Sequence, residues 1–122
     1  MDTRRNLPNR TYEEISRVRA SHSWPESEKT LEARLRRGVE RRGGMALKLS
    51  AQLHRGLPDR MVLLPGGKIH FVEMKTTGKR PTLLQRHCHA ELRSLGFPVW
   101  VIDSTEKIDD FFLMIDLERL NI

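Results

Sequence analysis

The feature that most constrains the fold is a pair of β-prone runs separated by a very short connection. Residues 61–64 and residues 68–75 are rich in Val, Ile, Leu, Met and Phe. Residues 65–67, with the sequence Pro-Gly-Gly, have the composition and the length of a hairpin turn. The sequence therefore predicts an antiparallel hairpin near the middle of the chain.

The length of this turn also predicts which residues face each other across the hairpin. If the three turn residues are the whole connection, Leu64 lies opposite Lys68. Counting back along both strands then places Asp59 opposite Glu73. A shift of one residue would break this pairing, and the sequence alone does not exclude such a shift.

The chain is expected to form one domain preceded by a basic arm. Its 122 residues are enough for one hydrophobic core and too few for two. Residues 1–25 contain five arginines, and a capping box formed by Thr11 and Glu14 predicts a short helix there. Residues 26–122 carry the remaining elements and are expected to fold as a single domain.

Start and stop signals predict three longer helices. The first has Ser23 as its N-cap and ends at Gly43, the second runs from Pro81 to Gly96, and the third follows Ser104. Each has apolar residues at helical spacing that are expected to face inward. These residues are Leu31, Leu35 and Val39 in the first helix, Leu84, Cys88, Leu92 and Leu95 in the second, and Ile108, Phe111, Phe112 and Ile115 in the third.

Two further strands complete the predicted architecture. Met45, Leu47 and Leu49 recur with the period of a half-buried strand. Residues 99–102 form a continuous apolar run, which is typical of a central strand covered on both faces. The resulting order of elements, α, α, β, β, β, α, β, α, predicts an α/β fold with a mixed central sheet flanked by helices.

The charge of the chain indicates a polyanionic partner. Lys and Arg number 22 against 16 Asp and Glu, which gives a net charge of +6 and an isoelectric point near 10.1. Residues 45–102 carry nine basic and three acidic side chains, whereas residues 103–122 carry two basic and six acidic ones. A basic excess is also typical of a solvated surface, so charge alone does not decide in favour of nucleic acid.

The sequence also predicts the compartment. The chain has a single cysteine, Cys88, no apolar leader sequence and no apolar run near the ~20 residues of a membrane-spanning helix. We therefore expect an intracellular protein in a reducing environment, without a membrane partner.

Charged residues occur where a core would favour apolar ones. Glu73 and Lys75 share one face of their strand with Ile69 and Phe71. Carboxylates as close as Glu73 and Asp59 repel each other unless a cation lies between them, and hard oxygen ligands suit Mg²⁺ or Mn²⁺. An adjacent ammonium group would orient or activate a water and stabilise charge on a phosphate. The pattern predicts metal-assisted phosphodiester hydrolysis.

Segments in a characteristic order carry a resemblance to a known family. They are residues 56–60 (Gly-Leu-Pro-Asp-Arg), residues 71–76 (Phe-Val-Glu-Met-Lys-Thr), residues 78–79 (Gly-Lys), Gln85 and residues 96–101 (Gly-Phe-Pro-Val-Trp-Val). Together they resemble the VRR-NUC domain, a branch of the PD-(D/E)XK nuclease superfamily, over residues 28–104. The resemblance implies a restriction-endonuclease-like mixed central sheet, with the site at one end of the sheet between two helices.

The resemblance also implies a metal site. Asp59 and Glu73 would be side-chain ligands of Mg²⁺ or Mn²⁺, and the Met74 carbonyl would contribute. Glu32 would be the helical glutamate that completes the site. That assignment depends on the position of Glu32 within its helix and on no distinctive motif.

The remaining implied roles concern catalysis and the substrate. Lys75 would be the catalytic lysine, and Gln85 would position the substrate or Lys75. Small stand-alone members of the family resemble homodimeric endonucleases that act on branched DNA, notably Holliday junctions. Two alternatives stay open: a non-catalytic nucleic-acid-binding module, and a nuclease for flaps or single-stranded ends.

Structural explanations of the same residues also exist. Glu73 and Lys75 would form a surface ion pair on an exposed strand, Glu32 would pair with Arg36 on a solvated helix, and Asp59 would be a turn residue. The run His87-Cys88-His89 suggests zinc, but consecutive helical residues point about 100° apart and one cysteine provides no CxxC motif. Cys88 is therefore expected to lie in the core.

Overall fold

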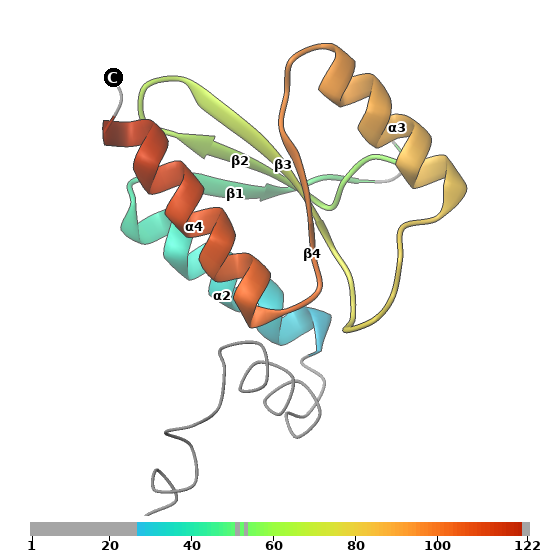
Figure 1. Cartoon of the computed structure of the whole chain (residues 1–122), viewed down its shortest axis with the longest axis horizontal. Helices are drawn as coiled ribbons and strands as arrows, with labels where there is room; N and C mark the ends of the chain where they lie inside the picture. Colours follow the sequence, from blue (N-terminus) through green and yellow to red (C-terminus); the bar gives the residue numbers. More distant parts are fainter. Residues whose placement is uncertain (1–26, 51, 53, 121–122) are drawn as a thin grey trace, which may run out of the picture.

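The computed structural model describes residues 27–50, 52 and 54–120, and Figure 1 shows their arrangement. The elements follow in the order α2 (Glu28–Arg41), β1 (Met45–Lys48), β2 (Arg60–Leu64), β3 (Lys68–Met74), α3 (Leu83–Ser94), β4 (Val99–Ile102) and α4 (Thr105–Leu120). The described strands form one sheet, β1-β2-β3-β4, in which β4 is parallel to β3 and the other pairs are antiparallel. The predicted α/β fold with a mixed sheet flanked by helices is confirmed. None of the described helices has both the length and the apolar character needed to cross a membrane.

Helix α2 begins later than the sequence signals predict. Its N-cap is Ser27, whose Oγ accepts a hydrogen bond from the Thr30 N–H at 3.2 Å. The prediction of Ser23 as the N-cap is wrong, because Ser27 lies one turn closer to the apolar stripe of the helix and caps it directly. Ser23 itself, like the predicted arm of residues 1–25, lies outside the described residues.

The hairpin forms in the predicted register. Leu64 pairs with Lys68, as the length of the turn requires. At the far end of the hairpin, the next opposed positions are Asp59 and Glu73. Oδ2 of Asp59 accepts a hydrogen bond from the Met74 N–H at 2.7 Å, which fixes this carboxylate to β3.

Helices α2 and α4 cover one face of the sheet, and the main hydrophobic core lies between them and the strands (Figure 1). The buried residues of this core are Leu31, Leu35, Val39, Val62, Val72, Met74, Ile102, Ile108, Phe111 and Ile115. Arg42, the C-cap of α2, donates from Nε and Nη2 to the two carboxylate oxygens of Asp116 in α4, at 2.7 and 3.0 Å. These hydrogen bonds lower the pKa of Asp116 and link the ends of the two helices.

Helix α3 lies against the other face of the sheet. Because side chains alternate along a strand, Phe71 and Glu73 of β3 point away from the core that contains Val72 and Met74. Glu73 contacts α3 directly, through Gln85. The two faces of the sheet are therefore covered differently, by two helices on one side and by one helix on the other.

The orientation of α3 differs from the prediction. Leu84 and Leu95, which were expected to face inward, are 49% and 73% exposed. Cys88 is buried as predicted, and its neighbour His89 is buried with it. The helix is turned in this way because the part of the sheet beneath it carries a carboxylate, which polar side chains can contact and leucines cannot.

Strand β4 is an edge strand of the described sheet, so its predicted central position is wrong. The connection through α3 adds β4 beside β3, parallel to it. Ile102 lies in the core under α2 and α4, whereas Val99 is buried on the α3 side, where Arg93 Nη2 donates to its carbonyl at 2.9 Å. Coverage of both faces explains why this edge strand is apolar throughout.

The substitution Gly38→Ala is expected to destabilise the protein, although alanine is normally the better helix former by about 1 kcal/mol. Gly38 is buried in α2, and a Cβ at this position would overlap the ring of Phe112 in α4. Overpacking of this kind costs about 1–3 kcal/mol, so a net loss in the free energy of unfolding is expected in urea denaturation. In the Phe112→Leu background, the same substitution should be neutral or stabilising. A stabilising effect in the wild-type background would contradict this packing of α2 on α4.

Candidate active site

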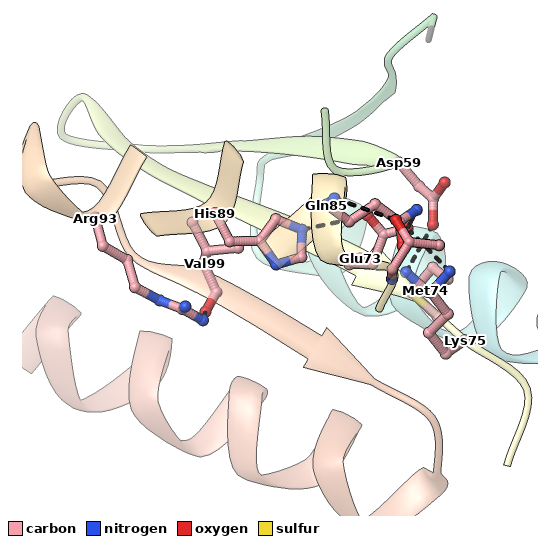
Figure 2. A network of polar contacts seen from close by, with 9 residues as sticks. Asp59, Glu73, Met74, Lys75, Gln85, His89, Arg93 and Val99 are labelled. Atoms are coloured by element: carbon pink, nitrogen blue, oxygen red, sulfur yellow. Dashed lines mark hydrogen bonds and ion pairs between the residues drawn. The ribbon is translucent and has the colours of Figure 1, made fainter. Parts of the chain in front are cut away.

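Charged residues that the sequence pattern groups together lie at one end of β3 (Figure 2). Asp59 directly precedes β2. Glu73 is the penultimate residue of β3, and Lys75 directly follows that strand. Nζ of Lys75 lies 4.0 Å from Oε1 of Glu73. Asp59 reaches the same strand end through its 2.7 Å hydrogen bond from the Met74 N–H. The structure therefore brings Asp59, Glu73 and Lys75 together.

The carboxylate of Glu73 is buried between the sheet and α3, and the residue is 1% exposed. Burial, followed by the charge of Asp59, raises the pKa of Glu73 to about 8, although the ammonium group of Lys75 acts in the opposite direction. The charged form has lost its hydration and lies close to a second carboxylate. This environment favours a cation beside Glu73.

Gln85 holds Glu73 from the first turn of α3. Its Nε2 donates to Oε1 of Glu73 at 3.3 Å. Its own Oε1 accepts from the Thr82 N–H at 2.9 Å, in a capping box in which the Thr82 hydroxyl oxygen accepts from the Gln85 N–H at 3.2 Å. The cap thus directs the amide nitrogen toward the carboxylate. Gln85 was expected to position substrate or Lys75, and its observed contact is with Glu73.

His89 is a residue of the site that sequence reasoning missed. It is 1% exposed, and its Nε2 lies 3.4 Å from Oε2 of Glu73. The available signal was spacing, because Gln85 and His89 are four residues apart and so share one face of the helix. His87 lies on the outer side, where it is exposed and its Nε2 is 3.3 Å from Glu91.

Glu32 forms an ion pair with a different residue from the one expected. Its Oε2 is 3.7 Å from Nη2 of Arg60, the first residue of β2, so the ion pair seen is not the helical pair with Arg36. Among the described residues, no three His, Cys, Asp or Glu side chains are grouped closely enough to hold a metal ion. The expected cluster of Glu32 with Asp59 and Glu73 is therefore not assembled.

The residues that do converge nevertheless fit a hard divalent cation. Oε2 of Glu73 is a buried oxygen without a hydrogen-bond partner in the described part of the chain. A cation between Asp59 and Glu73 would compensate both the lost hydration and the mutual repulsion. Two carboxylates and the Met74 carbonyl are hard oxygen donors, and Mg²⁺ is commonly held by one or two carboxylates together with water and phosphate oxygens.

Similarity to known proteins extends over about two thirds of the chain. No family model matches it. A curated protein named "Putative nuclease p44", from Acyrthosiphon pisum secondary endosymbiont phage 1, is 46% identical over 79 residues, which cover 65% of this chain and 85% of the relative. A solved structure described as "VRR_NUC domain" matches with a TM-score of 0.64 and 33% identity, covering 68% of this chain and 90% of that one.

The substitution Glu73→Gln is expected to stabilise the metal-free protein at alkaline pH. The folded-state pKa of Glu73, about 8, lies above the ordinary value of 4.5, so the stability linked to its neutral form is fully present below 4.5 and is lost as the pH rises through 8. The amide stays neutral, so the gain should be on the order of 1 kcal/mol or more near pH 9 and close to zero near pH 4. Thermal unfolding in EDTA measures this difference.

The matched control for this prediction is Glu91→Gln. The Glu91 side chain is 57% exposed on α3. Its substitution removes only an exposed contact with His87, so it should change the melting temperature little at either pH value. A gain in stability for Glu73→Gln that did not depend on pH would contradict the assignment of Glu73 as a buried carboxylate with a raised pKa.

Proposed function

This chain belongs to the VRR-NUC family of nucleases, and on that premise we propose that it is a divalent-metal-dependent endonuclease that hydrolyses phosphodiester bonds in branched DNA. The observation that carries the proposal is the convergence of Asp59, Glu73 and Lys75 at the end of β3. Hard carboxylate ligands next to an ammonium group are the components that metal-assisted phosphodiester hydrolysis requires.

The proposed cofactor is Mg²⁺ or Mn²⁺. Asp59 and Glu73 would hold it through side-chain oxygens, together with the backbone carbonyl of Met74. Glu32 remains a proposed member of the site through the resemblance alone, since its carboxylate contacts Arg60 in the structure. When bound, such an ion polarises a phosphate and makes a water molecule more acidic.

Lys75 is the proposed catalytic lysine. Its Nζ lies 4.0 Å from Oε1 of Glu73, and its side chain is partly exposed. In this position it would orient the attacking water and stabilise the negative charge that develops on the phosphate. Gln85 is proposed to act through Glu73, as a positioning residue that donates a hydrogen bond to its carboxylate. Asp59 and Glu73 each accept a hydrogen bond without substrate present, which limits the reorganisation that the reaction requires.

Branched DNA, in particular a four-way junction, is the proposed substrate, and a homodimer is the proposed active form. Both follow from the resemblance to small stand-alone members of the family. Two symmetric cuts across a junction require two sites related by a two-fold axis, which a homodimer supplies. Exposed Lys79 and Arg80 lie in the loop after Lys75, and we propose them as phosphate contacts.

The substitution Lys75→Ala is expected to reduce the cleavage rate at least ~100-fold, because it removes charge stabilisation in the transition state. DNA affinity should change little, since one ammonium group is a small part of the electrostatic footprint. The measurement uses labelled four-way, flap, single-stranded and duplex DNA, with Mn²⁺, Mg²⁺ or EDTA. Lys68→Ala is the matched control, because Lys68 is an exposed lysine at the other end of β3.

The pattern of cleavage separates the alternatives. Paired cuts in the four-way substrate support the proposal in full. Preferential cleavage of flaps or single-stranded ends would support a metal-dependent nuclease but would exclude the four-way junction as its preferred substrate. Absence of metal-dependent cleavage on every substrate would overturn it and identify a nucleic-acid-binding module instead.

DNA binding is expected to weaken steeply with salt, because basic side chains displace counterions from several phosphates. Replacing Lys79 and Arg80 together by alanine should reduce the slope of log affinity against log salt by about 2. Fluorescence anisotropy with the catalytically inactive Lys75→Ala protein in EDTA measures both effects. Arg119→Ala, exposed on α4, should leave the slope unchanged. A flat salt response would exclude this basic loop as a DNA contact.

A further inference from the structure

Two buried polar atoms face each other behind the candidate site. In the described part of the chain, Nε2 of His89 and Oε2 of Glu73 are both buried side-chain atoms without a hydrogen-bond partner. The distance between them is 3.4 Å, slightly longer than a good N–H···O hydrogen bond. Figure 2 shows the His89 ring pointing from α3 toward the Glu73 carboxylate, on the same side as the Gln85 amide.

Burying a histidine here has a cost that packing alone does not explain. A buried ring nitrogen without a hydrogen-bond partner is unfavourable, because it has lost its hydration and nothing in the described part of the chain replaces it. A neutral ring with its proton on Nε2 presents an N–H donor to Oε2 of Glu73.

The other carboxylate oxygen of Glu73 is engaged separately. Oε1 accepts from Gln85 Nε2 at 3.3 Å and lies 4.0 Å from Nζ of Lys75. Rotation about the last torsion of a glutamate is soft, so one hydrogen bond does not fix the plane of the carboxylate. Two donors one helical turn apart, each on a different oxygen, do fix that plane.

On the basis of the proposed function, we propose that His89 is a positioning residue that donates to Oε2 of Glu73 and thereby holds this carboxylate in the orientation that binds a divalent cation. Removal of a residue that donates a hydrogen bond to a metal ligand typically weakens metal affinity or activity about 10–100-fold.

The test compares Mn²⁺ binding by the full-length wild-type protein with that of His89→Leu, His89→Gln and His87→Leu. Isothermal titration without DNA gives the affinity independently of turnover, and cleavage assays give the Mn²⁺ concentration for half-maximal rate. His89→Leu keeps the packing and removes the donor, so its dissociation constant for Mn²⁺ should rise at least ~10-fold. His89→Gln keeps a donor at a similar distance and should recover most of the loss. His87→Leu, at the exposed histidine of the same helix, should match the wild type.

The outcomes separate this inference from the proposed function. If the wild type neither binds Mn²⁺ nor cleaves DNA, the proposed function fails, and the inference fails with it. If the wild type binds Mn²⁺ and His89→Leu binds it equally well, only the inference is overturned. If His89→Leu does not fold, as judged by thermal unfolding in EDTA, His89→Gln is compared with His89→Ser, which cannot reach Glu73. Equal Mn²⁺ affinity of those two variants overturns the proposal, and tighter binding by His89→Gln supports it.

Discussion

The burial of one carboxylate, that of Glu73, between the sheet and α3 is the constraint on which the arrangement of the candidate site depends. A carboxylate withdrawn from water needs donors or cations around it, because otherwise its charged form is strongly disfavoured. Here Gln85 and His89 reach it from α3, and Lys75 reaches it from the end of its own strand. Asp59 adds a second negative charge, which makes the need for a cation greater. The same requirement explains why α3 turns polar residues inward and leaves leucines in solvent.

Much of the fold was predictable because local patterns determine it. The three-residue turn sets the register of the hairpin, and that register brings Asp59 to the end of β3 beside Glu73. The apolar stripes of α2 and α4 follow from helical spacing and are buried as predicted, except that Phe112 is only partly buried. Within the candidate site, Glu73 and Lys75 share a strand face because side chains alternate, so their proximity also follows from a local rule.

The errors have a common cause, which is that tertiary contacts decide between local alternatives. On α3, the leucines and the polar residues each have helical spacing, and only the buried carboxylate on the sheet explains why His89 faces inward and Leu84 does not. The ion pair of Glu32 with Arg60 joins a helix to a strand, so no spacing along the helix predicts it. The edge position of β4 depends on the route of the chain through α3, and hydropathy records only that both its faces are covered.

The candidate site and the main hydrophobic core lie on opposite faces of the sheet and come from different segments of the chain. Most of the proposed chemical groups come from one continuous stretch, residues 59–89, whereas the layer that supports the strands comes from α2 before it and α4 after it. Those helices meet through the core and through the Arg42–Asp116 pair. Contacts between distant parts of a chain form late, because loop closure has an entropic cost. The hairpin can thus pair from local contacts alone, whereas the layer that supports the candidate site is complete only when α4 packs against α2 and the sheet. A chain shortened before α4 would keep nearly all of its reactive groups and lack the support that holds them in place.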